Sequence, residues 1–117
     1  MIIALVEVPL SGPKRDTEFV IEQSLAATKI FHPVEGLRRK YFLNNERGGG
    51  GVYEFETREA ADAWFNDDWA DWMEGRFGAR PVLSIFDCDV VLDNLADEVR
   101  VGGVAVKKPW EEKKDAD

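Results

Sequence analysis

The order in which strand-like and helix-like segments follow one another most constrains the fold of this chain. Four segments have the branched aliphatic or aromatic composition of β-strands, namely residues 2–8, 37–43, 51–57 and 81–91. Three segments repeat apolar side chains at helical spacing, namely residues 17–30, 58–65 and 69–73. The resulting order predicts an α+β fold, a ferredoxin-like βαββαβ plait with an antiparallel four-stranded sheet and its helices on one face.

A chain of 117 residues suits one ordinary domain. We assign residues 1–94 to the plait and residues 95–117 to a C-terminal extension that ends in a polar tail from Lys107 onward. Within the extension, residues 99–101 and 104–106 flank a Gly-Gly pair and predict short edge strands.

The second and third strands predict a hairpin. Residues 44–50 between them are polar and glycine-rich, and we interpret them as a flexible loop. Cross-strand pairs of opposite charge or of two aromatic rings each stabilise a hairpin by about 0.2–1 kcal/mol. We therefore predict a register in which Lys40 lies opposite Glu54 and Tyr41 opposite Tyr53, so that Lys40 and Glu54 share one face of the sheet.

Both faces of the predicted sheet are apolar. The first strand alone carries Ile2 and Ile3, then Leu5 and Val6, in both alternation classes. Helices on one side leave the other face bare, and a monomer rarely exposes an apolar surface of that size. We therefore predict a homodimer in which two sheets pack face to face.

The composition excludes several function classes. Lys and Arg number 15 against 23 Asp and Glu, and the net charge of −8 argues against partners such as nucleic acid or an anionic membrane surface. The chain has one cysteine, Cys88, and one histidine, His32, which excludes an intramolecular disulfide and a two-histidine metal centre within one chain. We recognise neither a signal peptide nor a membrane span, and we expect a cytoplasmic protein.

Several motifs resemble a known family when taken together. They are Gly36-Leu37-Arg38-Arg39-Lys40-Tyr41-Phe42, Gly50-Gly51-Val52-Tyr53-Glu54-Phe55-Glu56-Thr57-Arg58-Glu59-Ala60-Ala61, Gly78-Ala79-Arg80-Pro81 and Val90-Val91-Leu92-Asp93-Asn94. They resemble the YdhR-type mono-oxygenases of the dimeric α+β barrel superfamily, over roughly residues 2–94. The resemblance implies a ferredoxin-like protomer, a barrel built from two sheets, a pocket between sheet and helices, and mono-oxygenase activity.

The candidate site residues are aromatic or ionisable. Lys40, Tyr53 and His32 are the candidate catalytic residues, and the candidate substrate-binding residues are Trp64, Tyr41, Glu54, Trp69 and Phe65. Two interpretations of Lys40 and Glu54 stay open. If their face looks at the helices, Lys40 holds a phenolate and Glu54 tunes it; otherwise the two form a structural cross-strand pair. The aromatic residues likewise either line a ligand wall or pack in the core.

Three hypotheses for function follow. The first is a cofactor-independent mono-oxygenase that acts on a small aromatic or quinol-like substrate in an apolar pocket. The second is a non-catalytic homodimer that binds a small apolar ligand. The third is haem binding through His32.

Overall fold

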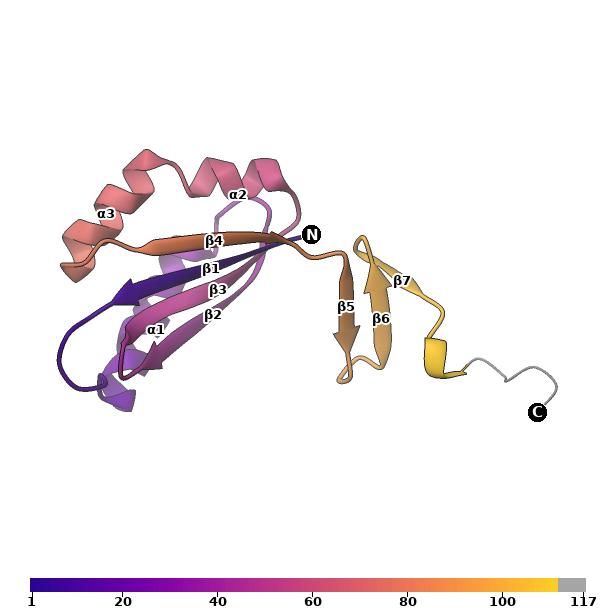
Figure 1. Cartoon of the computed structure of the whole chain (residues 1–117), viewed down its shortest axis with the longest axis horizontal. Helices are drawn as coiled ribbons and strands as arrows, with labels where there is room; N and C mark the ends of the chain where they lie inside the picture. The colour runs from indigo at the N-terminus through magenta and orange to yellow at the C-terminus, as the bar shows by residue number, and fades with distance from the viewer. Residues whose placement is uncertain (112–117) are drawn as a thin grey trace.

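The computed structural model describes residues 1–111, which form a plait and a smaller arm (Figure 1). The plait has one antiparallel sheet in the order β2-β3-β1-β4, formed by β1 (Ile2–Pro9), β2 (Leu37–Asn45), β3 (Gly48–Phe55) and β4 (Val82–Asp87). Its helices are α1 (Thr17–Phe31), α2 (Arg58–Trp64) and α3 (Asp67–Phe77). The predicted α+β class with a four-stranded antiparallel sheet is confirmed, and the strand order is compatible with a ferredoxin-like plait.

Side-chain caps fix where the helices begin. The Asp16 carboxylate accepts a hydrogen bond from the N–H of Phe19, and the Thr57 hydroxyl accepts one from the N–H of Ala60. The Asn66 side chain accepts a hydrogen bond from the N–H of Trp69 at 2.9 Å and so separates α2 from α3. The predicted break between these two helical segments is therefore confirmed.

The core lies between the sheet and the helices. Alternate residues of β1 point toward the helices and are buried, namely Ile2, Ala4, Val6 and Val8. They pack in one cluster with residues from all three helices, namely Ala27 and Phe31 of α1, Ala61 of α2, and Trp69 and Met73 of α3. All three helices therefore cover the same face of the sheet.

The hairpin differs from its prediction in both loop and register. The turn consists of Glu46 and Arg47 alone, and the glycines that follow belong to β3. Lys40 lies opposite Tyr53 and Tyr41 opposite Val52, one residue away from the predicted register, and the pairing shifts between Leu37 and Arg39. Because a slip by one residue exchanges the two faces of a strand, Lys40 and Glu54 lie on opposite faces.

β3 begins with four glycines, residues 48–51, which we call the glycine run. This run allows the close contact between β1 and β3. Gly50 has a φ of +151°, and a Cβ there would lie 2.0 Å from the carbonyl oxygen of Val6. Gly48 meets the carbonyl of Val8 in the same way. The prediction of a flexible loop over residues 44–50 was wrong because composition alone does not distinguish glycines that permit motion from glycines that permit close backbone approach.

The second face of the sheet carries no helix. We call it the open face, and its apolar residues are Ile3, Leu5, Tyr41, Leu43, Val52, Val82 and Phe86. Tyr41, Val82 and Phe86 are each more than half exposed. The predicted apolar character of both sheet faces is thus confirmed.

The predicted strand over residues 81–91 is two strands in two sheets. β1 begins at Ile2, which pairs with Asp87, so β4 has no ladder partner beyond that point. Only Cys88 and Asp89 separate β4 from β5, and the N–H of Cys88 donates to the carbonyl of Met1 at 2.9 Å. The plait therefore ends at Asp87, earlier than the predicted boundary at residue 94.

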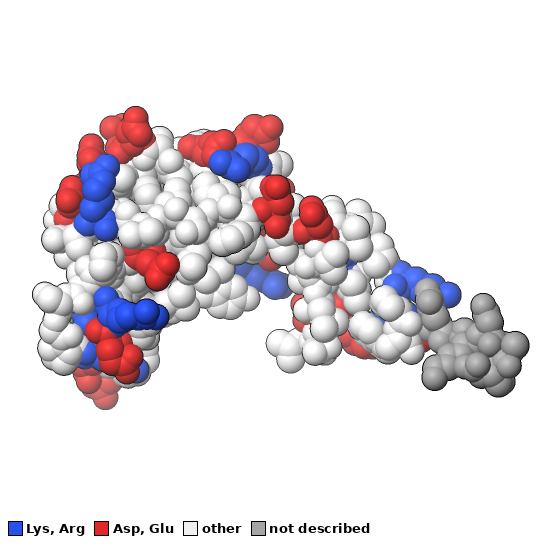
Figure 2. Space-filling view, viewed as in Figure 1, with Lys and Arg blue, Asp and Glu red and all other residues white. Residues whose placement is uncertain are grey.

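The remaining described residues form the arm, residues 90–111, which projects from the plait (Figures 1 and 2). It contains a three-stranded sheet of β5 (Val90–Asp93), β6 (Glu98–Val101) and β7 (Val104–Val106), followed by the short 3₁₀ helix η1 (Pro109–Glu111). The two predicted short strands are confirmed, although they pair in a sheet of their own. The rest of the predicted polar tail, residues 112–117, lies outside the described residues.

None of the helices in residues 1–111 combines the length and the apolar composition needed to cross a membrane.

The substitution Gly50→Ala tests the close contact between β1 and β3. Its Cβ would collide with the Val6 carbonyl, and the positive φ is strained for alanine, so we expect the free energy of unfolding to fall by about 2 kcal/mol or more. Gly75→Ala is the matched control, because Gly75 lies within α3 with open space around it. It should raise stability by about 0.5–1 kcal/mol. Urea denaturation measures the stability of both variants, and equal effects would contradict this contact.

Candidate functional site

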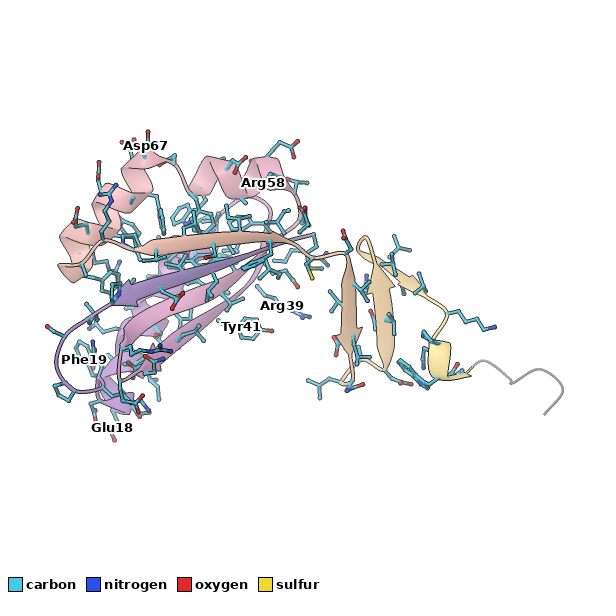
Figure 3. The ribbon with its side chains drawn as sticks, viewed as in Figure 1. Glu18, Phe19, Arg39, Tyr41, Arg58 and Asp67 are labelled. Atoms are coloured by element: carbon cyan, nitrogen blue, oxygen red, sulfur yellow. The ribbon has the colours of Figure 1, made fainter. Side chains whose placement is uncertain are left out.

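A cavity of about 360 Å³ lies between the sheet, α1 and α3. β1, β2 and β3 form its floor, and α1 and α3 contribute the facing walls. Its aromatic lining residues are Phe19, Phe31, Phe42, Tyr53, Trp72 and Phe77. Phe19 is half-exposed and lies at the end of the plait distant from the arm (Figure 3). The volume is at the small end of the range of ligand sites, which suits a small ligand.

The Lys40 side chain enters this cavity from β2 and is surrounded by aromatic rings. Its Nζ lies 3.2 Å from the ring centroid of Phe31, 4.1 Å from that of Phe42 and 4.8 Å from that of Tyr53. Within residues 1–111 no carboxylate forms an ion pair with it. The ring faces attract the ammonium form, although they replace only part of the hydration that it loses.

The environment lowers the pKa of Lys40 from 10.5 to about 7. Burial is the main cause, because a low-dielectric site disfavours the charged form. The nearby positive charge of Arg76 acts in the same direction. Near neutral pH the cavity therefore holds a mixture of ammonium and free amine, and a free amine can accept a proton.

Every charged residue that lines the cavity is basic. Besides Lys40 these are Arg76 of α3 and Arg15, which precedes α1. The Arg76 guanidinium carbon lies 5.4 Å from the ring centroid of Trp72 and 5.6 Å from that of Phe77. The Asn44 amide donates to the carbonyl of Arg15 at 2.9 Å and thereby links β2 to the segment before α1. In a chain of net charge −8, this local positive charge favours an anionic ligand.

Two glycines of β3 leave room for the cavity. Gly49 and Gly51 lie on the face of the sheet that faces the helices, in register with Val8 and Val6. A Cβ at Gly51 would lie 3.1 Å from Cε of Lys40 and 3.3 Å from Cε2 of Tyr53. Gly51 thus allows the lysine stem and the tyrosine ring to lie side by side.

The structure brings together two of the three predicted catalytic residues. Lys40 and Tyr53 lie opposite each other on neighbouring strands and both line the cavity. Tyr53 is buried, and burial raises the pKa of its hydroxyl far above the usual value, so Tyr53 remains a neutral phenol. It can act as a hydrogen-bond donor rather than as a base.

Tyr41 and Glu54 lie outside the cavity, contrary to the prediction that Glu54 shares a face with Lys40. Both belong to the open face, where Glu54 lies opposite Arg39 and Tyr41 opposite Val52. Figure 3 shows Tyr41 and Arg39 projecting from the same side of the sheet. The Lys40–Glu54 pair that both sequence-based interpretations assumed does not form, because the two-residue turn at Glu46 and Arg47 sets a different register.

His32 is exposed at the C-cap of α1 and does not line the cavity. Its backbone N–H donates to the carbonyl of Thr28.

The three predicted aromatic wall residues of the helical region pack in and around the core. Phe65 contacts Tyr53 and Trp69 with ring centroids 5.1 and 4.9 Å apart, and Trp64 contacts Phe31 at 5.5 Å. The core interpretation of Trp64, Phe65 and Trp69 therefore describes their positions.

Sequence reasoning missed Arg76, the charged residue that α3 contributes to the cavity. Trp72 and Arg76 are one helical turn apart, and this i, i+4 spacing places a cation beside a ring. That spacing could have indicated a shared surface. It could not have shown that the surface faces Lys40, since the contact joins segments distant in sequence.

No family model matches this chain, and no curated protein matches it in sequence. The resemblance to YdhR-type mono-oxygenases therefore stays a prediction. Residues 1–111 contain no cluster of three or more His, Cys, Asp or Glu side chains arranged to hold a metal ion.

The substitution Lys40→Met tests the burial of this amine. Between pH 7 and about 10 the unfolded chain holds a proton on Lys40 that the folded chain has released, so the free energy of unfolding should rise with pH. Methionine removes the ionisation, so the variant should be about 2–4 kcal/mol more stable than the wild type at pH 7, with a difference that shrinks toward pH 10.

The measurement is urea denaturation at several pH values, with the exposed Lys29 changed to Met as the control. A constant difference between Lys40→Met and the wild type across this pH range would show that Lys40 is not buried as described.

Proposed function

We propose that this protein is a cofactor-independent mono-oxygenase that binds a small phenolic or quinol-like substrate in the cavity. The observation that carries the proposal is the Lys40 amine, which lies among aromatic rings with no carboxylate paired to it in the described part of the chain. An amine with a pKa near 7 is suited to take the proton of a phenol at neutral pH.

The other residues of the cavity favour the binding of an aromatic anion. The rings of Phe31, Phe42 and Trp72 offer apolar surface for a substrate ring. The guanidinium groups of Arg76 and Arg15 favour the phenolate once it has formed. The mostly apolar lining around Lys40 lowers the local polarity, which strengthens these electrostatic contacts.

In the proposed reaction, Lys40 accepts the phenolic proton and the electron-rich phenolate reacts directly with molecular oxygen. For a phenol with a free para position, the para C–H bond is replaced by a C=O bond, and the product is the para-quinone. One oxygen atom of O₂ enters the ring, and the other leaves as water with the two hydrogens lost by the substrate. The substrate supplies all four electrons, so the reaction needs no second reductant.

A second candidate is a non-catalytic protein that binds a small aromatic anion. The three basic groups of the cavity favour it, because they can hold an aromatic carboxylate without any proton transfer. Haem binding through His32 gains no such support, since His32 lies outside the cavity lining.

The proposal includes a homodimer in which two sheets form an α+β barrel. The open face supports it, because Tyr41, Val82 and Phe86 are each more than half exposed on one contiguous sheet face. Packing two such faces together would remove both apolar surfaces from water in one symmetric contact.

Substitutions at Lys40 test whether its amine acts as a base or only as a positive charge. Lys40→Arg keeps a positive charge but cannot accept a proton at neutral pH, so turnover of 1-naphthol should fall by about 100-fold or more while binding of 1-naphthoate persists. Lys40→Met should lose turnover and also weaken 1-naphthoate binding by about tenfold. Wild-type turnover should rise with pH through about 7, where the amine loses its proton.

Oxygen uptake and quinone formation measure turnover, with buffer-only reactions to subtract spontaneous oxidation. Anthrone serves as a second substrate. If neither compound consumes oxygen above background while 1-naphthoate binds in a Lys40-dependent manner, the non-catalytic alternative is correct.

Phe86→Glu tests the homodimer. A carboxylate on the open face should disfavour sheet-to-sheet packing, and sedimentation velocity should show a shift from dimer to monomer. Ile21→Glu is the matched control, since Ile21 is 53% exposed against 54% for Phe86 but lies on α1. A monomeric wild type, or equal effects of both substitutions, would refute the proposed dimer.

A further inference from the structure

The sheet of the arm has two chemically different faces. Residues directly opposite each other in its ladders share a face, and so do alternate residues along each strand. One face consists wholly of aliphatic side chains, namely Val90, Leu92, Val99, Val101, Val104 and Val106. The other carries Asp93, Glu98 and Arg100, with an ion pair between Arg100 and Glu98. We call the first the aliphatic face of the arm.

Much of the aliphatic face is exposed in the described chain. Val99 at its centre is buried, but Val90, Leu92 and Val104 are each more than half exposed. Only Cys88 and Asp89 connect the plait to the arm. This linker is too short for the arm to fold back onto its own plait. Two backbone hydrogen bonds fix this linker. The N–H of Cys88 donates to the carbonyl of Met1, and the N–H of Gly102 donates to the carbonyl of Asp89.

We propose that the aliphatic face of the arm packs against a second copy of this chain, the same copy that covers the open face. This inference rests on the homodimer described under Proposed function. Figure 1 draws α1 behind the sheet and α2 and α3 above it, so the open face looks downward and toward the viewer. The arm descends on that side, and Figure 2 shows a mainly uncharged arm surface toward the viewer. A partner seated on the open face would therefore also meet the arm.

Two-fold symmetry makes this contact reciprocal. If the arm of one copy reaches its partner, the arm of the partner reaches the first copy, and no aliphatic face is left over. Three short strands alone have little stability in water, so the partner also supplies the packing that such a sheet lacks.

Single substitutions on the two faces of the arm test the proposal. Leu92→Glu and Val104→Glu each place a carboxylate on the aliphatic face, at side chains 57% and 66% exposed in the single chain. Ala105→Glu is the matched control, because Ala105 is the next residue of the same strand and points to the other face. We expect the dimer dissociation constant, measured by sedimentation equilibrium, to rise at least tenfold for the first two and to stay within about twofold for the control.

Photo-cross-linking identifies directly which molecule packs against the aliphatic face of the arm. A benzoylphenylalanine introduced at Leu92 of the full chain should give covalent dimers on irradiation, with cross-linked peptides from the partner. Cross-links confined to one chain, or only to added lipid vesicles of phosphatidylcholine and phosphatidylglycerol, would overturn the proposal. Unchanged dissociation constants for Leu92→Glu and Val104→Glu would overturn it as well.

The outcomes separate this inference from the proposed function. If Phe86→Glu dissociates the dimer while Leu92→Glu and Val104→Glu do not, the arm proposal fails and the sheet-to-sheet dimer stands. If the wild-type chain is monomeric, the arm proposal fails with the dimer. The oxygen-uptake and ligand-binding tests at Lys40 decide the cavity chemistry in either case.

Discussion

The close approach of β1 and β3 along the glycine run is the constraint on which the rest of the structure depends. The Val6 carbonyl occupies the space that a Cβ at Gly50 would need, so at this position β3 can pair with β1 only because the residue is glycine. This pairing fixes which residues of β3 face the helices, and the tight turn at Glu46 and Arg47 transmits the same register to β2. The lysine reaches the cavity as a consequence of these backbone contacts.

The cavity places an ionisable group where folding alone would favour an apolar one. Desolvation of Lys40 opposes the charged form, and Arg76 adds repulsion rather than compensation. The ring of Phe31, 3.2 Å from Nζ, returns part of the lost hydration energy. A residue that is unfavourable for stability in this way is typical of a functional site, and the same desolvation produces the free amine that the proposed chemistry needs.

Local patterns were sufficient to predict the elements but not their mutual placement. The capping residues Asp16 and Asn66 and the helical spacing of Trp69 and Met73 gave correct helices, because those signals act over a few residues. The predicted hairpin register failed because the chain turns at Glu46 and Arg47 and pairs Asn45 with Gly48, whereas the side-chain pairs of about 0.2–1 kcal/mol assumed a longer loop. Lys40 and Tyr53 were predicted as site residues from their chemistry, whereas Arg76 was missed because the contact between α3 and β2 leaves no local pattern.

The intermediate pKa of Lys40 has a consequence for how a ligand enters the cavity. A neutral phenol that meets the free amine, and a phenolate that meets the ammonium, form a complex with the same total number of protons. The proton can then pass between ligand and lysine inside the cavity without exchange with bulk solvent. In the proposed reaction, a phenol would thus bind in either ionisation state and give the same bound complex.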